Sequence, residues 1–171
     1  MKRNLIWPML LCGLVVFYQN KTNSELWLMP SEDYVTENSY VITAQNWDFE
    51  VKALDKIQAQ FFKDSLDAHN RALWQQIENR GVDNAEQKFM AEMDQVKEKV
   101  QQAVNLSLNH EYINDIYGKI KRQNLQSKTV IQKMTEFEYR FMIYSFEKNN
   151  TQKTELRFVV DLRDNSIRMF K

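Results

Sequence analysis

The sequence predicts an α+β protein in which a short N-terminal membrane segment precedes two to three helices and a C-terminal three-stranded antiparallel meander. Three observations lead to this prediction. Residues 5–18 are uncharged and mostly apolar, residues 47–127 carry apolar side chains at spacings of three and four, and from residue 129 apolar and polar side chains alternate. The first pattern is typical of a membrane segment, the second of helices and the third of strands.

Residues 1–20 are predicted to form a signal-anchor segment. Lys2 and Arg3 precede the uncharged run, which keeps an N-terminus in the cytoplasm and sends the following chain across the membrane. As a helix the segment from residue 4 to residue 20 would be about 25 Å long, enough for a locally thinned bilayer. A cleaved signal peptide and a buried helix are the alternatives. The anchor is favoured over cleavage because the small residues that signal peptidase requires are missing at the end of the run.

Residues 21–46 are predicted to be a linker between the anchor and a domain at residues 47–171. The linker contains Leu26, Trp27, Leu28 and Met29, which either lie at the membrane interface, where tryptophan is favoured, or pack on the domain. Residues 39–44 are rich in β-branched side chains and are the candidate for a fourth strand.

Residues 47–127 are predicted to hold the helices. Between residues 47 and 80 two adjoining apolar stripes predict a helix that packs on more than one neighbour, with Gly81 as its stop. After a cap at Asp83 or Asn84, the next helix repeats apolar residues at 4-3-4-3 spacing from Phe89 to Ala103. This seam predicts either an antiparallel hairpin with the preceding helix or an intermolecular coiled coil. A last helical stripe ends near Leu125.

Residues 129–171 are predicted to form the meander. With turns at residues 149–152 and 164–165, Phe141 pairs with Val160 on the inner face, and Arg140 pairs with Asp161 on the outer face. The same register places an apolar group on the outer face: Met142, Tyr144, Val159 and Phe170. An outer sheet face is usually polar, so either another part of the chain covers this group or it is a partner-binding surface.

The inner face offers a second candidate site. A curved sheet with helices packed on it can enclose a small apolar pocket, for which the candidate lining residues are Trp74, Tyr139, Phe141 and Phe158. The alternative is an ordinary filled core.

The composition excludes several classes of function. Lys and Arg number 23, as do Asp and Glu, so there is no basic excess for binding nucleic acid. Cys12, in the apolar run, is the only cysteine, and three glycines cannot supply a phosphate-binding loop. His69 and His110 belong to no metal-ligand pattern. We therefore expect no catalytic residues, no metal and no cofactor, and we expect a protein that is not an enzyme.

The layout of an anchor, helices and then an antiparallel sheet resembles the periplasmic assembly factors of type IV secretion systems, which have a cone-shaped fold similar to that of nuclear transport factors. In size and topology it is also similar to small inner-membrane companions of membrane-bound transcriptional regulators. The first resemblance implies a periplasmic accessory protein that acts through protein–protein interaction in a secretion, pilus or signalling assembly. The second implies a domain that binds a small amphiphile. Either protein could form homo- or hetero-oligomers.

Overall fold

The computed structural model describes residues 24–31, 33–147, 149 and 151–170. The anchor predicted for residues 1–20 lies outside the described residues. None of the helices in the described part combines the length and the apolar character that a membrane span requires.

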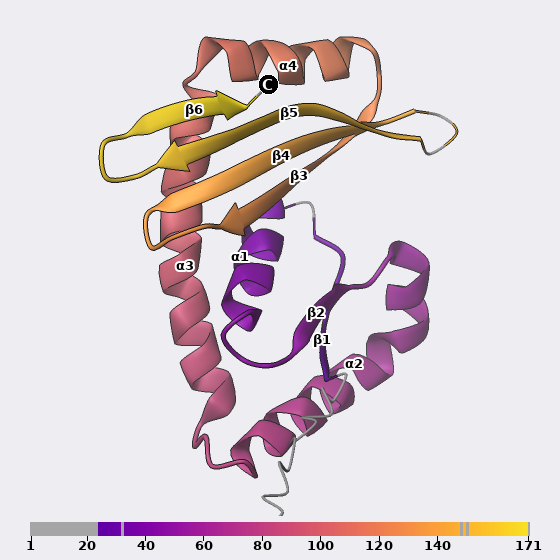
Figure 1. Cartoon of the computed structure of the whole chain (residues 1–171). Helices are drawn as coiled ribbons and strands as arrows, with labels where there is room; N and C mark the ends of the chain where they lie inside the picture. Colours follow the sequence, from indigo (N-terminus) through magenta and orange to yellow (C-terminus); the bar gives the residue numbers. More distant parts are fainter. Residues whose placement is uncertain (1–23, 32, 148, 150, 171) are drawn as a thin grey trace, which may run out of the picture.

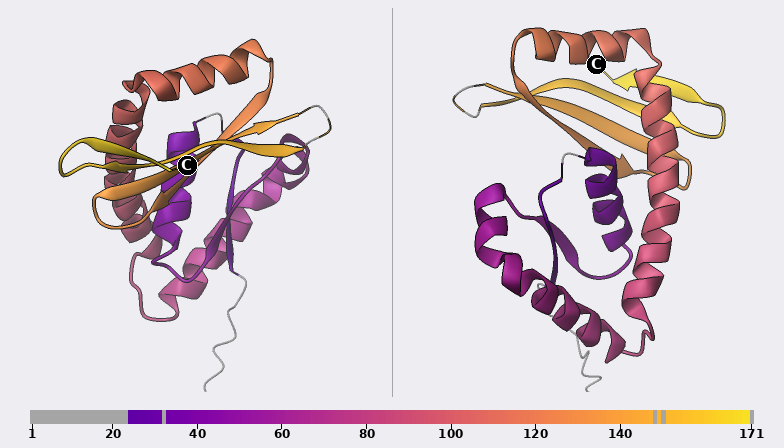
Figure 2. Two further views of the ribbon diagram at one scale, coloured as in Figure 1. Left: turned by 45° about the horizontal axis from the view of Figure 1, so that its top comes forward. Right: turned by 180° about the vertical axis from the view of Figure 1, so that it is seen from behind.

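The C-terminal half is a four-stranded antiparallel sheet with helices on one face (Figure 1). Its strands follow one another in the order β3 (Gln126–Lys133), β4 (Glu138–Phe146), β5 (Gln152–Asp161) and β6 (Ser166–Phe170). The helices α3 (Ala85–Leu108) and α4 (Glu111–Arg122) contribute to the core beneath the sheet. Figure 2 shows α3 crossing this inner face, and no helix lies in front of the opposite, outer face in Figure 1.

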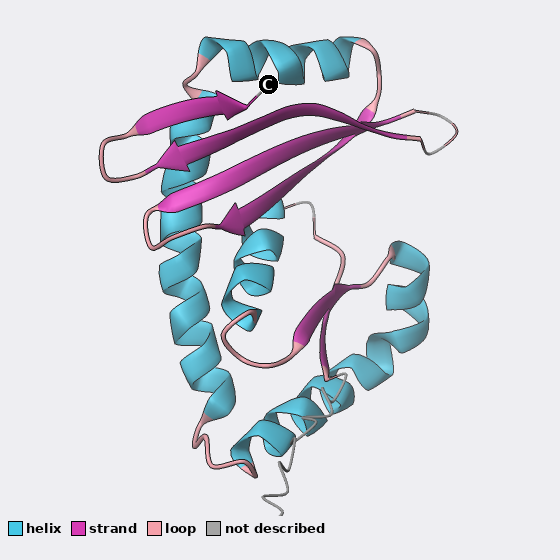
Figure 3. Ribbon diagram, in the orientation of Figure 1, coloured by secondary structure: helices cyan, strands magenta, loops and turns pink. Residues whose placement is uncertain are grey.

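The N-terminal half is a second layer built on the lower part of α3. It contains β1 (Glu25–Leu28), α1 (Tyr34–Ala44), β2 (Glu50–Ala53) and α2 (Lys56–Glu78). β1 and β2 form a short parallel pair, and Figure 3 shows this pair between α1 and α2. A separate apolar cluster around Trp74 and Phe89 fills this half.

The fourth strand is β3, and the prediction of a strand at residues 39–44 is wrong because these residues lie in α1. Asp33 starts the helix by accepting hydrogen bonds from the backbone N–H groups of Val35 and Thr36. Within α1, the buried hydroxyls of Ser39 and Thr43 donate to backbone carbonyls one turn earlier. Burial of the helix between α3 and β3 thus overrides its β-prone composition.

The segment predicted to be a linker also belongs to the fold. Leu26 is buried in the N-terminal apolar cluster, and Trp27 stacks on His69 with ring centroids 3.7 Å apart. These residues therefore pack on the domain. The helix predicted to begin at residue 47 begins at Lys56 instead, because residues 50–53 form the strand β2.

The apolar seam of α3 is buried as predicted, but its main partner is α1. Figure 1 shows α2 and α3 diverging from their junction, with α1, β1 and β2 between them. Gly81, with φ +96°, lies in that junction, where a left-handed backbone favours glycine. Neither a closed hairpin with α2 nor an intermolecular partner is needed to bury the seam.

The sheet register differs by two residues from the predicted one. Phe141 pairs with Phe158, which pairs with Met169, and Arg140 pairs with Val159 rather than Asp161. The last turn occupies four residues, 162–165, rather than two. Because side chains alternate with period two, a shift of two residues keeps the side chains of β4, of residues 156–161 and of β6 on their predicted faces.

Tyr139 is buried on the inner face of the sheet, and its hydroxyl has no hydrogen-bond partner among the described residues. Burial, and to a lesser extent the charge of Glu136, raises the pKa of Tyr139 to about 12. The folded state therefore favours the neutral phenol. The unfolded chain loses the phenol proton near pH 10 and the folded chain only near pH 12, so the free energy of unfolding is highest below pH 10 and falls as the pH rises toward 12.

We expect Tyr139→Phe to leave the free energy of unfolding unchanged or to raise it by about 1–2 kcal/mol, because it removes an unpaired buried hydroxyl. Between pH 10 and 12 the variant should lose less stability than the wild type. Urea unfolding at pH 7 and across that range measures both effects. Tyr117→Phe is the control: the hydroxyl of Tyr117 lies 2.8 Å from that of Thr129, so its loss should cost about 1 kcal/mol. A cost of that size at Tyr139 would contradict the prediction.

Candidate functional site

The four residues predicted to bind a partner all lie on the outer face of the sheet, but they are not equally accessible. Phe170 on β6 is 48% exposed, and Met142 and Tyr144 on β4 are half-buried. Val159 on β5 is only 4% exposed, because it lies between Arg140 and Arg168 on the neighbouring strands. The surface available to a partner is therefore made by Met142, Tyr144 and Phe170.

The charges at one end of the outer face neutralise each other. Arg163 donates to Asp161 at 2.5 Å and lies 3.9 Å from Glu138, which also accepts from Arg168 at 2.5 Å. Hydrogen bonds from the Arg163 side chain, and then from its backbone, lower the pKa of Asp161 to about 2. Asp161 is thus held ionised in a ladder that links β4, β5 and β6, which suits a structural role rather than acid catalysis.

A groove lies where β5 extends beyond the end of β6. Phe170 pairs with Arg157, so residues 152–156 have no strand neighbour on that side within the described part of the chain. The groove has a volume of about 480 Å³, and its apolar lining comes from Tyr112, Leu156, Met169 and Phe170. An extended segment of another protein could pair with such an edge.

A β-bulge shapes this groove. Ile143 pairs with Leu156 but Tyr144 pairs with Thr154, which leaves Glu155 as the extra residue. Its carboxylate is nearly buried and accepts from the Ser145 hydroxyl at 2.7 Å, with the Lys153 ammonium 3.1 Å away. The hydrogen bond from Ser145 is the main reason that the pKa of Glu155 is lowered. The groove therefore has a fixed carboxylate, paired with the Lys153 ammonium, beside apolar side chains.

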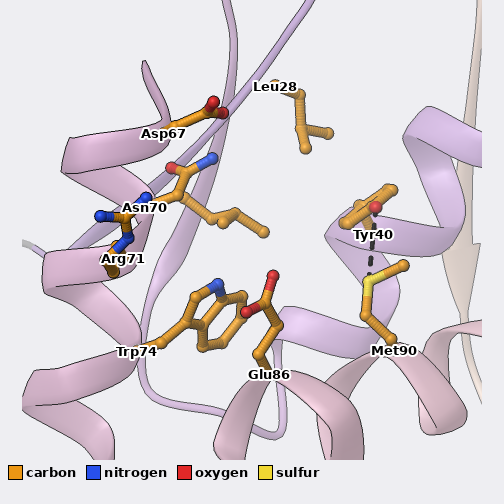
Figure 4. A pocket seen from close by; sticks show the side chains of 9 residues that line it. Leu28, Tyr40, Asp67, Asn70, Arg71, Trp74, Glu86 and Met90 are labelled. Atoms are coloured by element: carbon orange, nitrogen blue, oxygen red, sulfur yellow. Dashed lines mark hydrogen bonds between the residues drawn. The ribbon is translucent and has the colours of Figure 1, made fainter. Parts of the chain in front are cut away.

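The four residues predicted to line a ligand pocket lie in two separate places. Tyr139, Phe141 and Phe158 are fully buried under the sheet, where Phe141 and Phe158 stack with ring centroids 4.8 Å apart. Trp74 lies in the N-terminal apolar cluster. It lines a different pocket, of about 290 Å³, between α2, α3, α1 and β1 (Figure 4).

Sequence reasoning missed an exposed face on α2. Five of its residues lie at spacings of 4, 4, 3 and 4 and are all exposed: Ile57, Phe61, Ser65, Ala68 and Ala72. Phe61 is 80% exposed and Ile57 67%. We call these five residues the α2 stripe. Both apolar stripes of this helix were expected to be buried, but in the structure only Leu73 and Ile77 of the other stripe are, and Phe62 at its N-terminal end is 39% exposed.

Charge placement is the signal that could have revealed the α2 stripe. An ordinary surface helix carries its charges opposite its buried face. In α2 the described charged side chains fall outside the stripe, which is uncharged over about four turns. Isolated exposed apolar residues are common on proteins, but an uncharged face of this length opposite the core is not accounted for by packing within the described chain.

His69 has a structural position at the junction of α2 and β1. One ring nitrogen lies 2.8 Å from the carbonyl oxygen of Glu25, and the ring stacks on Trp27. His110 precedes α4, and its Nδ1 is buried without a partner among the described residues. Within residues 24–170, as far as they are described, no group of three or more potential ligands could hold a metal ion.

Comparison of the chain with models of protein families, with curated proteins and with solved structures gives no match.

Proposed function

We propose that this chain is an accessory protein that is anchored in the inner membrane by residues 1–20, exposes its domain to the periplasm, and acts by binding another protein of a secretion, pilus or signalling assembly. The observation that carries the proposal is the α2 stripe, whose apolar side chains are exposed along the outer face of a long helix. Large exposed apolar surfaces on otherwise polar proteins mark interaction sites.

The side chains of the α2 stripe suit a helix as the partner. Ile57 and Phe61 are large and project from the N-terminal part of the stripe, whereas Ser65, Ala68 and Ala72 are small. Small residues let a second helix approach the backbone closely, and the large residues then act as anchors at one end. The stripe extends over about 22 Å of helix, which corresponds to a contact of four turns.

The position of the α2 stripe also agrees with a membrane-proximal partner. The chain enters the described fold at Ser24, whose hydroxyl donates to the side chain of Gln76 near the end of α2. Only five residues separate Ser24 from the end of the apolar run at residue 18, and they span at most about 20 Å. Anchored in this way, α2 would lie near the membrane surface and within reach of helices that emerge from it.

The proposal predicts that Phe61→Glu strongly weakens partner binding. A charge introduced at an apolar anchor should weaken binding by at least about 30-fold, the loss associated with an interface hot spot. The measurement is crosslinking in intact cells, copurification of the full-length protein from membranes and mass spectrometry. Gln60→Glu is the matched control, because Gln60 is exposed on the same helix but lies outside the α2 stripe.

Three results of this experiment separate the possibilities. Loss of one stoichiometric partner from Phe61→Glu, but not from Gln60→Glu, supports the proposal, and a second copy of this chain would count as such a partner. A partner that Phe61→Glu retains and Met142→Lys loses would move the binding surface to the sheet. Met142 is chosen there because Val159 is buried. Recovery of the wild-type protein without any partner would show that the proposed function is wrong.

A further inference from the structure

The pocket in Figure 4 is lined by none of the residues of the α2 stripe and is independent of it. Its walls are supplied by Asp67, Asn70, Arg71 and Trp74 of α2, by Glu86 and Met90 of α3, and by residues of α1 and β1. The volume of about 290 Å³ is close to the lower end of the roughly 300–1,000 Å³ found for ligand sites. A ligand that fits it is small.

Three charged groups face this pocket without a protein partner. The side chains of Asp67, Arg71 and Glu86 are exposed at the rim of the pocket, and none of them forms a hydrogen bond or ion pair with a residue that the structure describes. Glu86 and Trp74 line the same pocket from α3 and α2, while Asp67 and Arg71 occupy successive turns of α2 (Figure 4). The pocket therefore offers two carboxylates and one guanidinium to a ligand.

The remaining polar groups of the pocket are already engaged. Asn70 accepts from the N–H of Trp27 at 3.0 Å and donates to its carbonyl oxygen at 2.9 Å, which fixes β1 against α2. The hydroxyl of Tyr40 donates to the sulfur of Met90 at 3.5 Å. Burial, followed by the nearby charges of Asp94 and Glu86, raises the pKa of Tyr40. The carboxylate of Glu86, which α3 contributes to the pocket, favours a positively charged ligand group.

The floor of the pocket is apolar. Trp74 and Leu26 are buried beneath it, and Leu28 and Met90 pack against the same cluster. An aromatic ring and a carboxylate that line one pocket are a favourable environment for an ammonium group, because the ring face and the carboxylate both attract positive charge. The apolar side chains can accommodate a hydrocarbon group of the same ligand.

We propose that this pocket binds a small zwitterion, namely an α-amino acid or dipeptide with an apolar side chain. The ammonium group pairs with Glu86 beside the ring of Trp74. The carboxylate pairs with Arg71, whose guanidinium matches the geometry of a carboxylate, and the apolar side chain contacts Leu28 and Met90. A simple amine would lack the contact with Arg71, and a simple anion would meet two carboxylates.

Isothermal titration of the full-length protein with L-leucine and leucyl-leucine tests this proposal. Two analogues serve as probes of the two charges: L-leucinamide lacks the carboxylate, and 4-methylpentanoate lacks the ammonium. We expect at least one of the two zwitterions to bind, and the loss of either charge to weaken binding by about 10- to 100-fold, as for a charge-assisted hydrogen bond. Lack of binding by both zwitterions at concentrations up to about 10 mM would overturn the proposal.

Variants assign the two contacts. Glu86→Gln and Arg71→Gln should each weaken leucine binding by about 10-fold or more. Arg71→Gln should also remove the difference between leucine and leucinamide, a result that a merely structural role of Arg71 would not produce. Glu98→Gln, an exposed carboxylate farther along α3, is the matched control and should bind like the wild type. Binding that neither Glu86→Gln nor Arg71→Gln changes would place the ligand elsewhere and contradict the proposal.

Discussion

Replacing Phe158 by alanine is expected to lower the free energy of unfolding by about 3–5 kcal/mol, the range measured for large aromatic residues removed from cores. Phe158 is fully buried, stacks on Phe141, and belongs to the core that joins the sheet to α1, α3 and α4. The aromatic ring is thus enclosed from several sides. Its loss would leave a cavity that the surrounding helices and strands can fill only in part.

Phe61→Ala is the matched control for this prediction. The chemical change is the same, but Phe61 is largely exposed on α2, and surface substitutions of this kind usually change stability by less than about 0.5 kcal/mol. Urea unfolding of both variants at pH 7 makes the comparison. A small loss for Phe158→Ala would indicate that its ring lines an open pocket, as the sequence analysis considered. Comparable losses for the two variants would contradict the description of α2 as a helix with an unpaired outer face.

The sheet illustrates what alternation of side chains can establish without a structure. The inner-face positions of Tyr139, Phe141 and Phe158 were all predicted correctly, because the choice of face depends only on the period of two. Register depends in addition on the length of each turn. The backbone N–H of Leu162 donates to the carbonyl oxygen of Phe137, which holds residue 162 outside the pairing of β5 with β6. Composition alone does not reveal this long-range bond.

α1 illustrates a feature that local sequence misrepresents. A run of β-branched residues within residues 39–44 favours a strand on propensity alone. The helical state is stabilised by contacts with α3 and β3, which are distant in sequence. The two asparagines that attach helices to strands, Asn38 and Asn70, are likewise recognisable only when the elements are placed side by side.

The candidate sites were predictable to different degrees. The alternation of side chains correctly placed Met142, Tyr144 and Phe170 on the outer face of the sheet. The burial of Val159 depends on the register, and therefore on the length of the turns. Trp74 was expected beside Tyr139, yet the two belong to different clusters because α2 diverges from α3. The pocket of Figure 4 combines residues from four elements, and no spacing along one element predicts such a combination.

Asn38→Ala is expected to cost about 2–6 kcal/mol, because Asn38 satisfies two backbone groups at the edge of the sheet that faces α1. It accepts from the N–H of Ile131 at 2.8 Å and donates to the carbonyl oxygen of Thr129 at 3.1 Å. Both bonds are buried, so alanine would leave a donor and an acceptor unpaired, at about 1–3 kcal/mol for each. The side chain therefore acts as a substitute for the neighbouring strand that β3 lacks on this side.

Asn70→Ala makes the matched comparison, since Asn70 bonds to both backbone groups of Trp27 in the same manner on β1. These bonds are only partly buried, and water can replace them in the variant, so we expect a smaller loss of about 1–2 kcal/mol. Urea unfolding measures both losses, and amide hydrogen exchange at Ile131 should accelerate in Asn38→Ala alone. The prediction would be wrong if the two variants lost equal free energy of unfolding, or if amide exchange at Ile131 were unchanged. Either result would mean that the packing of α1, rather than these hydrogen bonds, protects the edge strand β3.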